Sequence, residues 1–151
     1  MKRLLALLSV AVLSYSTLSS AAPTPFEYKD LRKGVSEKKM RSIYSLINHA
    51  SDNPQEVRLA ILNAMSQTKG TPWLLEREGE GYILARWDYK GHAIIHRIEY
   101  DDKAVQIKYD GGVNDYRCEL LVDDYCYKTH RNYYKYNLSL VKQLRKTLGS
   151  I

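Results

Sequence analysis

Residues 82–109 read YILARWDYKGHAIIHRIEYDDKAVQIKY, and this stretch decides the fold. Apolar and polar residues alternate along it in three runs, and a period of two is typical of half-buried β-strands. Only two or three turn residues separate each run from the next. The runs are Tyr82 to Tyr89, His92 to Tyr100 and Ala104 to Tyr109. Because turns this short join antiparallel neighbours, the stretch predicts a β-meander.

A fourth strand and three helices complete the predicted fold. The strand runs from Trp73 to Glu78 and turns at 79–81 into the meander. Helices are predicted where apolar residues recur every three to four positions. Their stripes are Met40, Ile43, Tyr44, Ile47 and Ala50 after Ser36; Val57, Ala60, Ile61, Ala64 and Met65 after an Asn53-Pro54 start signal; and Tyr133, Asn137, Leu140, Val141, Leu144 and Leu148 from about Thr129. The sequence therefore predicts an α+β domain with N-terminal helices, a four-stranded antiparallel meander and a C-terminal amphipathic helix.

The first residues have the order of a secretory signal peptide. A basic pair precedes an apolar run from Leu4 to Leu13, and small residues follow up to Ala21. About ten strongly apolar residues are too few to span a bilayer as a helix. We expect cleavage after Ala21, or at a poorer site one residue later, and no cysteine near the cut offers a lipid anchor. The predicted organisation is a signal peptide over 1–21, a tether or loosely docked arm over 22–35 and one periplasmic or secreted domain over 36–151.

The net charge and the cysteines indicate which partners and which compartment to expect. The chain has 23 basic and 17 acidic residues, and without Lys2 and Arg3 the balance is 21 to 17, a net charge of +4. This mild excess selects no partner and, with the export signal, disfavours nucleic acid. Cys118 and Cys126 predict one structural disulfide in an exported chain. We expect the glycine pair at 111–112 to end the sheet before them, and residues 120–122 to add a short edge strand.

A short motif in the C-terminal half resembles a known group of proteins. Its residues are, in chain order, Ile107-Lys108-Tyr109 at a strand end, Asn114 in a polar loop, and His130 with Tyr133 at the start of the last helix. In this order they resemble small exported proteins and lipoproteins of Gram-negative bacteria that share an I-H-x-x-Y-N-x-W helix start. This chain has Thr129, Tyr134 and Tyr136 where that motif has Ile, Asn and Trp. The function of that group is not established, so the resemblance implies a fold and a compartment and no activity.

Tyrosines are concentrated around the cysteine pair. Six of the 13 tyrosines fall between Tyr116 and Tyr136. A tyrosine combines a rigid apolar face with a polar tip, which suits contacts to protein or glycan, although the same side chains could pack beneath the disulfide loop. The leading hypothesis is a periplasmic, non-enzymatic binding or accessory module that contacts an envelope protein or a cell-wall glycan. Its candidate binding residues are His130, Tyr133, Tyr134, Tyr116, Asn114 and Arg131.

His130 also allows a different class of function. In a small hydrolase-like enzyme it would serve as the acid/base group. No carboxylate or nucleophile is visibly paired with it in the sequence, and in a purely structural role it would hydrogen-bond the loop that carries Asn114. A third hypothesis, a secreted enzyme inhibitor, requires a rigid loop that projects from the Cys118–Cys126 segment. No catalytic residue is assigned.

Metal and cofactor sites find no support in the sequence. On a strand, His92 and His96 are about 13 Å apart, too far to share one ion. His96 is instead predicted to be a histidine at the edge of the core. The two acidic doublets do not follow the calcium-loop pattern, and no G-x-S-x-G, Walker or G-x-G-x-x-G motif is present. We therefore expect neither a metal nor a cofactor.

Overall fold

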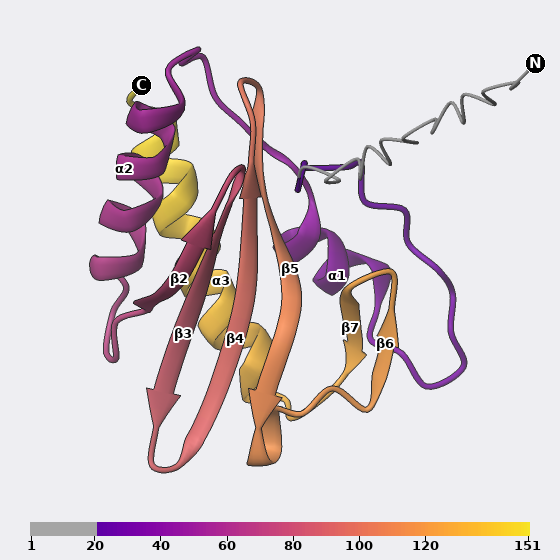
Figure 1. Cartoon of the computed structure of the whole chain (residues 1–151). Helices are drawn as coiled ribbons and strands as arrows, with labels where there is room; N and C mark the ends of the chain where they lie inside the picture. The colour runs from indigo at the N-terminus through magenta and orange to yellow at the C-terminus, as the bar shows by residue number, and fades with distance from the viewer. Residues whose placement is uncertain (1–20) are drawn as a thin grey trace, which may run out of the picture.

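The computed structural model describes residues 21–151, so the predicted signal peptide lies outside the described residues except for Ala21. In this part of the chain, three α-helices and a five-stranded antiparallel sheet form an α+β domain, with a two-stranded hairpin beside it (Figure 1). The helices are α1 (Glu37–Tyr44), α2 (Pro54–Ser66) and α3 (Asn132–Leu148), and a 3-10 turn spans Asn114–Tyr116. The strands are β1 (Ile47–Asn48), β2 (Leu74–Gly79), β3 (Tyr82–Tyr89), β4 (His92–Tyr100), β5 (Ala104–Val113), β6 (Leu120–Val122) and β7 (Tyr125–Lys128).

The predicted meander is confirmed and gains one strand. Strands β2 to β5 are antiparallel neighbours in chain order, and β1 adds to the free edge of β5. The sequence placed this extra strand in the first helix, which was wrong. Helix α1 ends at Tyr44 because Ser45 is extended, and Ile47 then pairs with Val105. Ile47 is buried in this position, whereas Ala50 at the end of the predicted stripe is exposed.

The predicted alternation places one face of the sheet in the core. α3 runs across this face behind the meander, and α2 packs beside it (Figure 1). The buried side chains on this face include Ile83, Ala85, Trp87, Ile94, Ile98, Val105 and Ile107. All belong to one hydrophobic cluster with the inner faces of the helices. Sheet and helices therefore stabilise each other through one continuous core.

His96 is the polar centre of this core. Its ring is fully buried and stacks on Trp73 with centroids 5.1 Å apart. Nδ1 lies 3.1 Å from the carbonyl oxygen of Lys108, and Nε2 lies 2.5 Å from the side-chain Oδ1 of Asn137 on α3. Both oxygens are acceptors, and a neutral imidazole carries one proton, so the His96 ring donates to one of them at a time. Burial lowers the pKa of His96 from 6.5 to about 4, so the ring is neutral at pH 7.

The glycine pair does not end the sheet as predicted. Strand β5 continues through it to Val113, with a register shift opposite Ile95 and His96 that is typical of a β-bulge. A Cβ on Gly112 would lie 2.0 Å from the carbonyl oxygen of Tyr116, whereas one on Gly111 would meet nothing closer than 3.5 Å. Gly112 is thus required by the close approach of the following turn.

The predicted disulfide joins Cys118 to Cys126 with Cα atoms 5.7 Å apart. Residues 120–122 form the short strand that the sequence predicted, β6, but it pairs with β7 in a separate hairpin instead of joining the main sheet. The hairpin turn is held against the domain, because the Tyr109 amide donates to the carbonyl of Asp124 over 2.8 Å. Lys29 contacts the Asp123 carboxylate of the same turn at 2.5 Å.

Residues 22–35, expected to be a tether or a loosely docked arm, contain no helix or strand but make specific contacts. The backbone of Thr24 forms two hydrogen bonds with the buried side chain of Gln106. The Thr24 N–H donates to Gln106 Oε1 over 2.9 Å, and Gln106 Nε2 donates to the Thr24 carbonyl over 2.7 Å. Phe26 is buried and meets Tyr125 edge to face, with centroids 4.8 Å apart. The arm therefore covers the hairpin side of β5.

Candidate binding site

The tyrosines among the candidate binding residues are interior, which decides between the surface and the core position that the sequence left open. Tyr133 is 0%, Tyr134 3% and Tyr116 5% exposed. The Tyr133 hydroxyl lies 2.6 Å from that of Tyr44, which also accepts the amide N–H of Cys126 over 3.2 Å. Burial raises the pKa of both hydroxyls, so they remain protonated donors. Most of the cluster is therefore part of the hydrophobic core.

The other candidates at the start of α3 are placed close together. His130 lies edge to face with Tyr116, centroids 5.7 Å apart, and its Nδ1 accepts the backbone N–H of Asn132 over 3.3 Å. Asn114 donates instead to the carbonyl of Gly91 over 2.8 Å. No carboxylate in residues 21–151 forms an ion pair with His130. The imidazole thus helps to fix the start of the helix and has no orienting acid.

The outward face of α3 is chemically different from its buried stripe. A hollow of about 700 Å³ follows this face. Lys39 of α1, Lys69 after α2, and Arg131, Lys135 and Lys142 at or along α3 line it, and all five are exposed. No Asp or Glu is among its lining residues. We call this hollow with its five cations the basic groove. Of the candidate binding residues, Arg131 and Tyr134 line it and the others do not.

The five cations of the basic groove have no acidic partners. In the described part of the chain, none of them lies within ion-pair distance of a carboxylate. Lys39 has its ammonium over the ring of Tyr134, 5.1 Å from the centroid. Close like charges repel, and an anion that enters the groove would relieve this repulsion.

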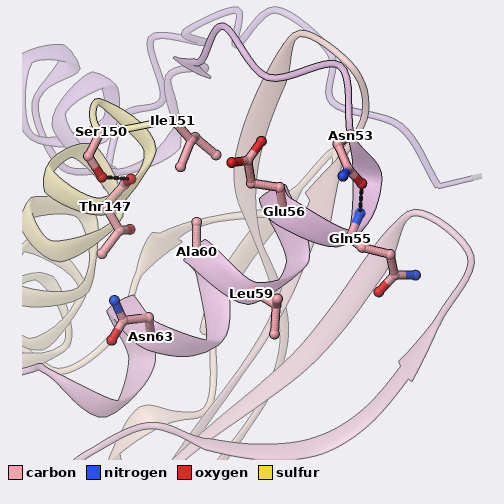
Figure 2. A pocket seen from close by; sticks show the side chains of 9 residues that line it. All are labelled: Asn53, Gln55, Glu56, Leu59, Ala60, Asn63, Thr147, Ser150 and Ile151. Atoms are coloured by element: carbon pink, nitrogen blue, oxygen red, sulfur yellow. Dashed lines mark hydrogen bonds between the residues drawn. The ribbon is translucent and has the colours of Figure 1, made fainter.

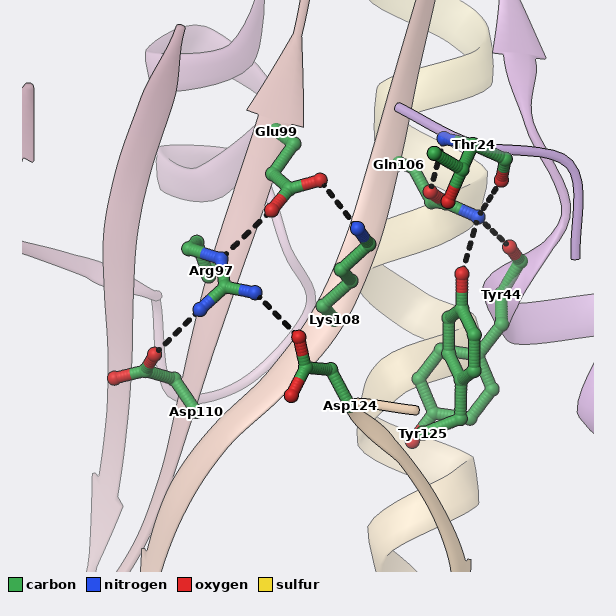
Figure 3. A network of polar contacts seen from close by, with 9 residues as sticks. All are labelled: Thr24, Tyr44, Arg97, Glu99, Gln106, Lys108, Asp110, Asp124 and Tyr125. Carbon is green, nitrogen blue, oxygen red and sulfur yellow. Dashed lines mark hydrogen bonds and ion pairs between the residues drawn. The ribbon is translucent and has the colours of Figure 1, made fainter. Parts of the chain in front are cut away.

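On the face of the sheet that α3 does not cover, cations form ion pairs, in contrast to the cations of the basic groove (Figure 3). There, Arg97 donates to Glu99 over 2.8 Å and to Asp124 over 2.7 Å, and reaches Asp110 at 3.4 Å. Lys108 contacts the second oxygen of the buried Glu99 at 2.7 Å. These ion pairs tie β4, β5 and the hairpin turn together. Arg97 and Lys108 are therefore paired with carboxylates of the protein itself.

Two polar atoms in the lining of the basic groove lack a partner. The Tyr134 hydroxyl and the Gln143 Oε1 are buried and form no hydrogen bond within residues 21–151. Burial raises the pKa of the Tyr134 hydroxyl, so it is a donor without an acceptor. A buried polar atom without a partner is uncommon and costs free energy. Both residues belong to the lining of the basic groove.

Sequence reasoning missed Lys39, Lys69 and Lys142 as site residues. A signal for part of the groove was present: no acidic residue follows Asp124, while six Lys or Arg residues do. Positions 131, 135, 138, 139 and 142 also share one face of a helix at 3.6 residues per turn. The contributions of Lys39 and Lys69 needed the tertiary packing of α1 and α2 against α3.

A second hollow, of about 500 Å³, lies between α2 and the C-terminal end of the chain (Figure 2). Asn53 caps α2 there by accepting the N–H of Gln55 over 3.0 Å. The only charged side chain in its lining, Glu56, is engaged by the hydroxyl of Ser51. This hollow offers neither the excess charge nor the unpartnered atoms of the basic groove.

Comparison with known proteins adds no assignment. No family model matches the chain, and no curated protein or solved structure matches it. Among residues 21–151, no helix has both the length and the apolar character needed to cross a membrane. Function is therefore argued from the groove.

Proposed function

We propose that the protein is an exported, non-enzymatic binding module that holds an anionic partner in the basic groove, either a cell-wall glycan or an acidic part of an envelope protein. The observation that carries this proposal is the set of five exposed cations around one hollow without a carboxylate. Such a surface attracts anions at long range and favours their binding at short range.

Export is supported by three independent features. The first residues have the basic, apolar and small-residue order of a signal peptide. The disulfide between Cys118 and Cys126 is typical of oxidising compartments. The motif that begins at Ile107 resembles exported proteins of Gram-negative bacteria. Together they favour a periplasmic or secreted protein.

The two other classes have less support. A hydrolase that uses His130 would need an orienting acid or a nucleophile, and its Nδ1 already accepts a helix N–H. An inhibitor would need a projecting loop, whereas Asp123 and Asp124 in the hairpin turn are bound to Lys29 and Arg97 of the domain. A binding module requires neither feature.

Affinity recovery from envelope extracts tests the proposal. The bait is the chain from residue 22 onward, compared with a Lys135→Gln/Lys142→Gln variant that removes two groove charges. The matched control is Lys90→Gln/Lys103→Gln, which makes the same change in net charge in turns outside the groove. We expect the groove variant to lose the partner that the parent and the control recover. Equal recovery by all three folded proteins would contradict the proposal.

A further inference from the structure

We infer that the ligand of the basic groove is a linear, hydroxyl-rich anionic glycan that lies along α3. This inference rests on the proposed function and names the class of partner. It follows from the dimensions of the groove, from the position of apolar residues, from the orientation of its aromatic rings and from its two unpartnered atoms.

The spacing of the cations fits an extended chain. Arg131 and Lys142 are 11 residues apart, which places them about 16 Å apart along the helix axis. Lys135 lies between them on the same helix face. A single anion would engage one end of this row, whereas a chain with repeated anionic groups engages all three cations together. The volume of about 700 Å³ lies within the usual range of ligand sites.

Among the residues that the structure describes, the groove has no exposed large apolar side chain that could anchor a protein partner. Within residues 21–151, the exposed large apolar side chains are Leu59, Leu74, Leu75, Tyr89 and Leu121, and none of them lines it. Leu138, the one aliphatic residue in the lining, is partly buried against the core. Protein interfaces depend on buried aromatic or aliphatic anchors surrounded by a polar rim. An acidic protein segment would find no exposed aliphatic or aromatic anchor here.

The aromatic rings of the groove are not free to stack on nucleobases. Tyr136 already stacks on Trp87, with centroids 4.2 Å apart. The ring of Tyr134 is buried and has the Lys39 ammonium over its face. Binding of single-stranded nucleic acid relies on exposed aromatic faces for base stacking. The groove therefore offers charge without a stacking platform.

A glycan supplies the partners that the two unpartnered atoms need. The Tyr134 hydroxyl requires an acceptor, which an anionic or hydroxyl oxygen provides, and Gln143 Oε1 requires a donor, which a sugar hydroxyl provides. The two residues are nine positions apart on α3. A ligand that spans both residues therefore needs an acceptor and a donor, and an acidic polysaccharide has both.

Binding of tetragalacturonate to the chain from residue 22 onward, measured by calorimetry at pH 7, tests this inference. Maltotetraose has the hydroxyls without the charge, hexaglutamate the charge without the hydroxyls, and an eight-nucleotide oligo(dT) and phosphatidylglycerol vesicles represent nucleic acid and membrane. We expect tetragalacturonate to bind at least about tenfold more tightly than either the saccharide or the peptide control. Tighter binding of hexaglutamate, oligo(dT) or the vesicles would overturn the inference.

A Tyr134→Phe variant separates ligand contact from a structural role. The hydroxyl makes no internal hydrogen bond, so its removal should leave the melting temperature unchanged or higher. Loss of its bond to an anionic ligand should weaken tetragalacturonate binding about tenfold. Unchanged affinity for tetragalacturonate, whatever the melting temperature, would contradict the inferred contact.

The outcomes also separate this inference from the proposed function. If no saccharide binds but the Lys135→Gln/Lys142→Gln variant still loses its envelope partner, the glycan inference is overturned and the binding module stands. If the variant changes neither tetragalacturonate binding nor partner recovery, both are overturned.

Discussion

Protonation of His96 should destabilise the fold over a defined pH range. The ring is fully buried, and its pKa falls from 6.5 to about 4 because burial disfavours the charged form. Between these values the unfolded chain binds a proton that the folded chain does not. The free energy of unfolding must therefore decrease as the pH falls below 6.5, with the full loss reached below pH 4.

The magnitude follows from the two pKa values of His96. Their separation corresponds to a loss of about 3 kcal/mol when complete, and to about 2 kcal/mol at pH 5. A contribution of this size is a substantial fraction of the stability of a small domain. Carboxylates such as Glu78, whose pKa is lowered by its hydrogen bond to Arg58, add a separate loss at lower pH.

Urea unfolding at pH 7, 6, 5.5 and 5 measures this loss. We expect the parent to lose about 2 kcal/mol over the series, and a His96→Gln variant to lose much less because its side chain does not titrate. The partly exposed His92 provides the control, and His92→Gln should keep the slope of the parent. If His96→Gln does not fold, an NMR titration of the parent should still show the His96 ring titrating near pH 4. A slope shared by all three proteins, or a ring that titrates near 6.5, would refute the reasoning.

Three further predictions concern local features of the fold. Reduction of the Cys118–Cys126 disulfide should lower the free energy of unfolding by about 2–3 kcal/mol, measured by urea unfolding with and without reductant; an unchanged midpoint would contradict this. Gly112→Ala should destabilise by more than about 2 kcal/mol because its Cβ has no room, whereas Gly111→Ala should be nearly neutral, and equal thermal shifts would show that the close approach is not limiting. Tyr133→Phe removes a buried hydrogen bond and should cost about 1 kcal/mol by the same unfolding assay; no measurable loss would mean that the bond adds nothing.

The strand pattern could be predicted because it depends on local alternation. The bounds of β3 and β4 agree with the sequence prediction to the residue, and the buried set that includes Ile94 and Ile98 follows from the period of two. Contacts between residues far apart in the sequence explain where the predicted elements were wrong. Ile47 continues a helical stripe in sequence but pairs with Val105, and the need for Gly112 arises from the turn that packs on it.

The candidate site was less predictable for a related reason. A tyrosine suits a surface and an interior equally well, and only the tertiary neighbours decide, as Tyr44 does for Tyr133. The local sequence around α3 contains three of the five groove cations. Lys39 and Lys69 join them only when α1 and the end of α2 are brought to the same face of α3.

The central claim is that an anionic partner binds on the outward face of α3, and NMR mapping tests it most directly. A titration of the ¹⁵N-labelled chain from residue 22 onward with tetragalacturonate would report the contact residue by residue. Our account predicts that the largest amide shifts fall within 131–143 and around Lys39 and Lys69. Shifts confined to the outer sheet face near Arg97, or to the hairpin near Leu121, would contradict it.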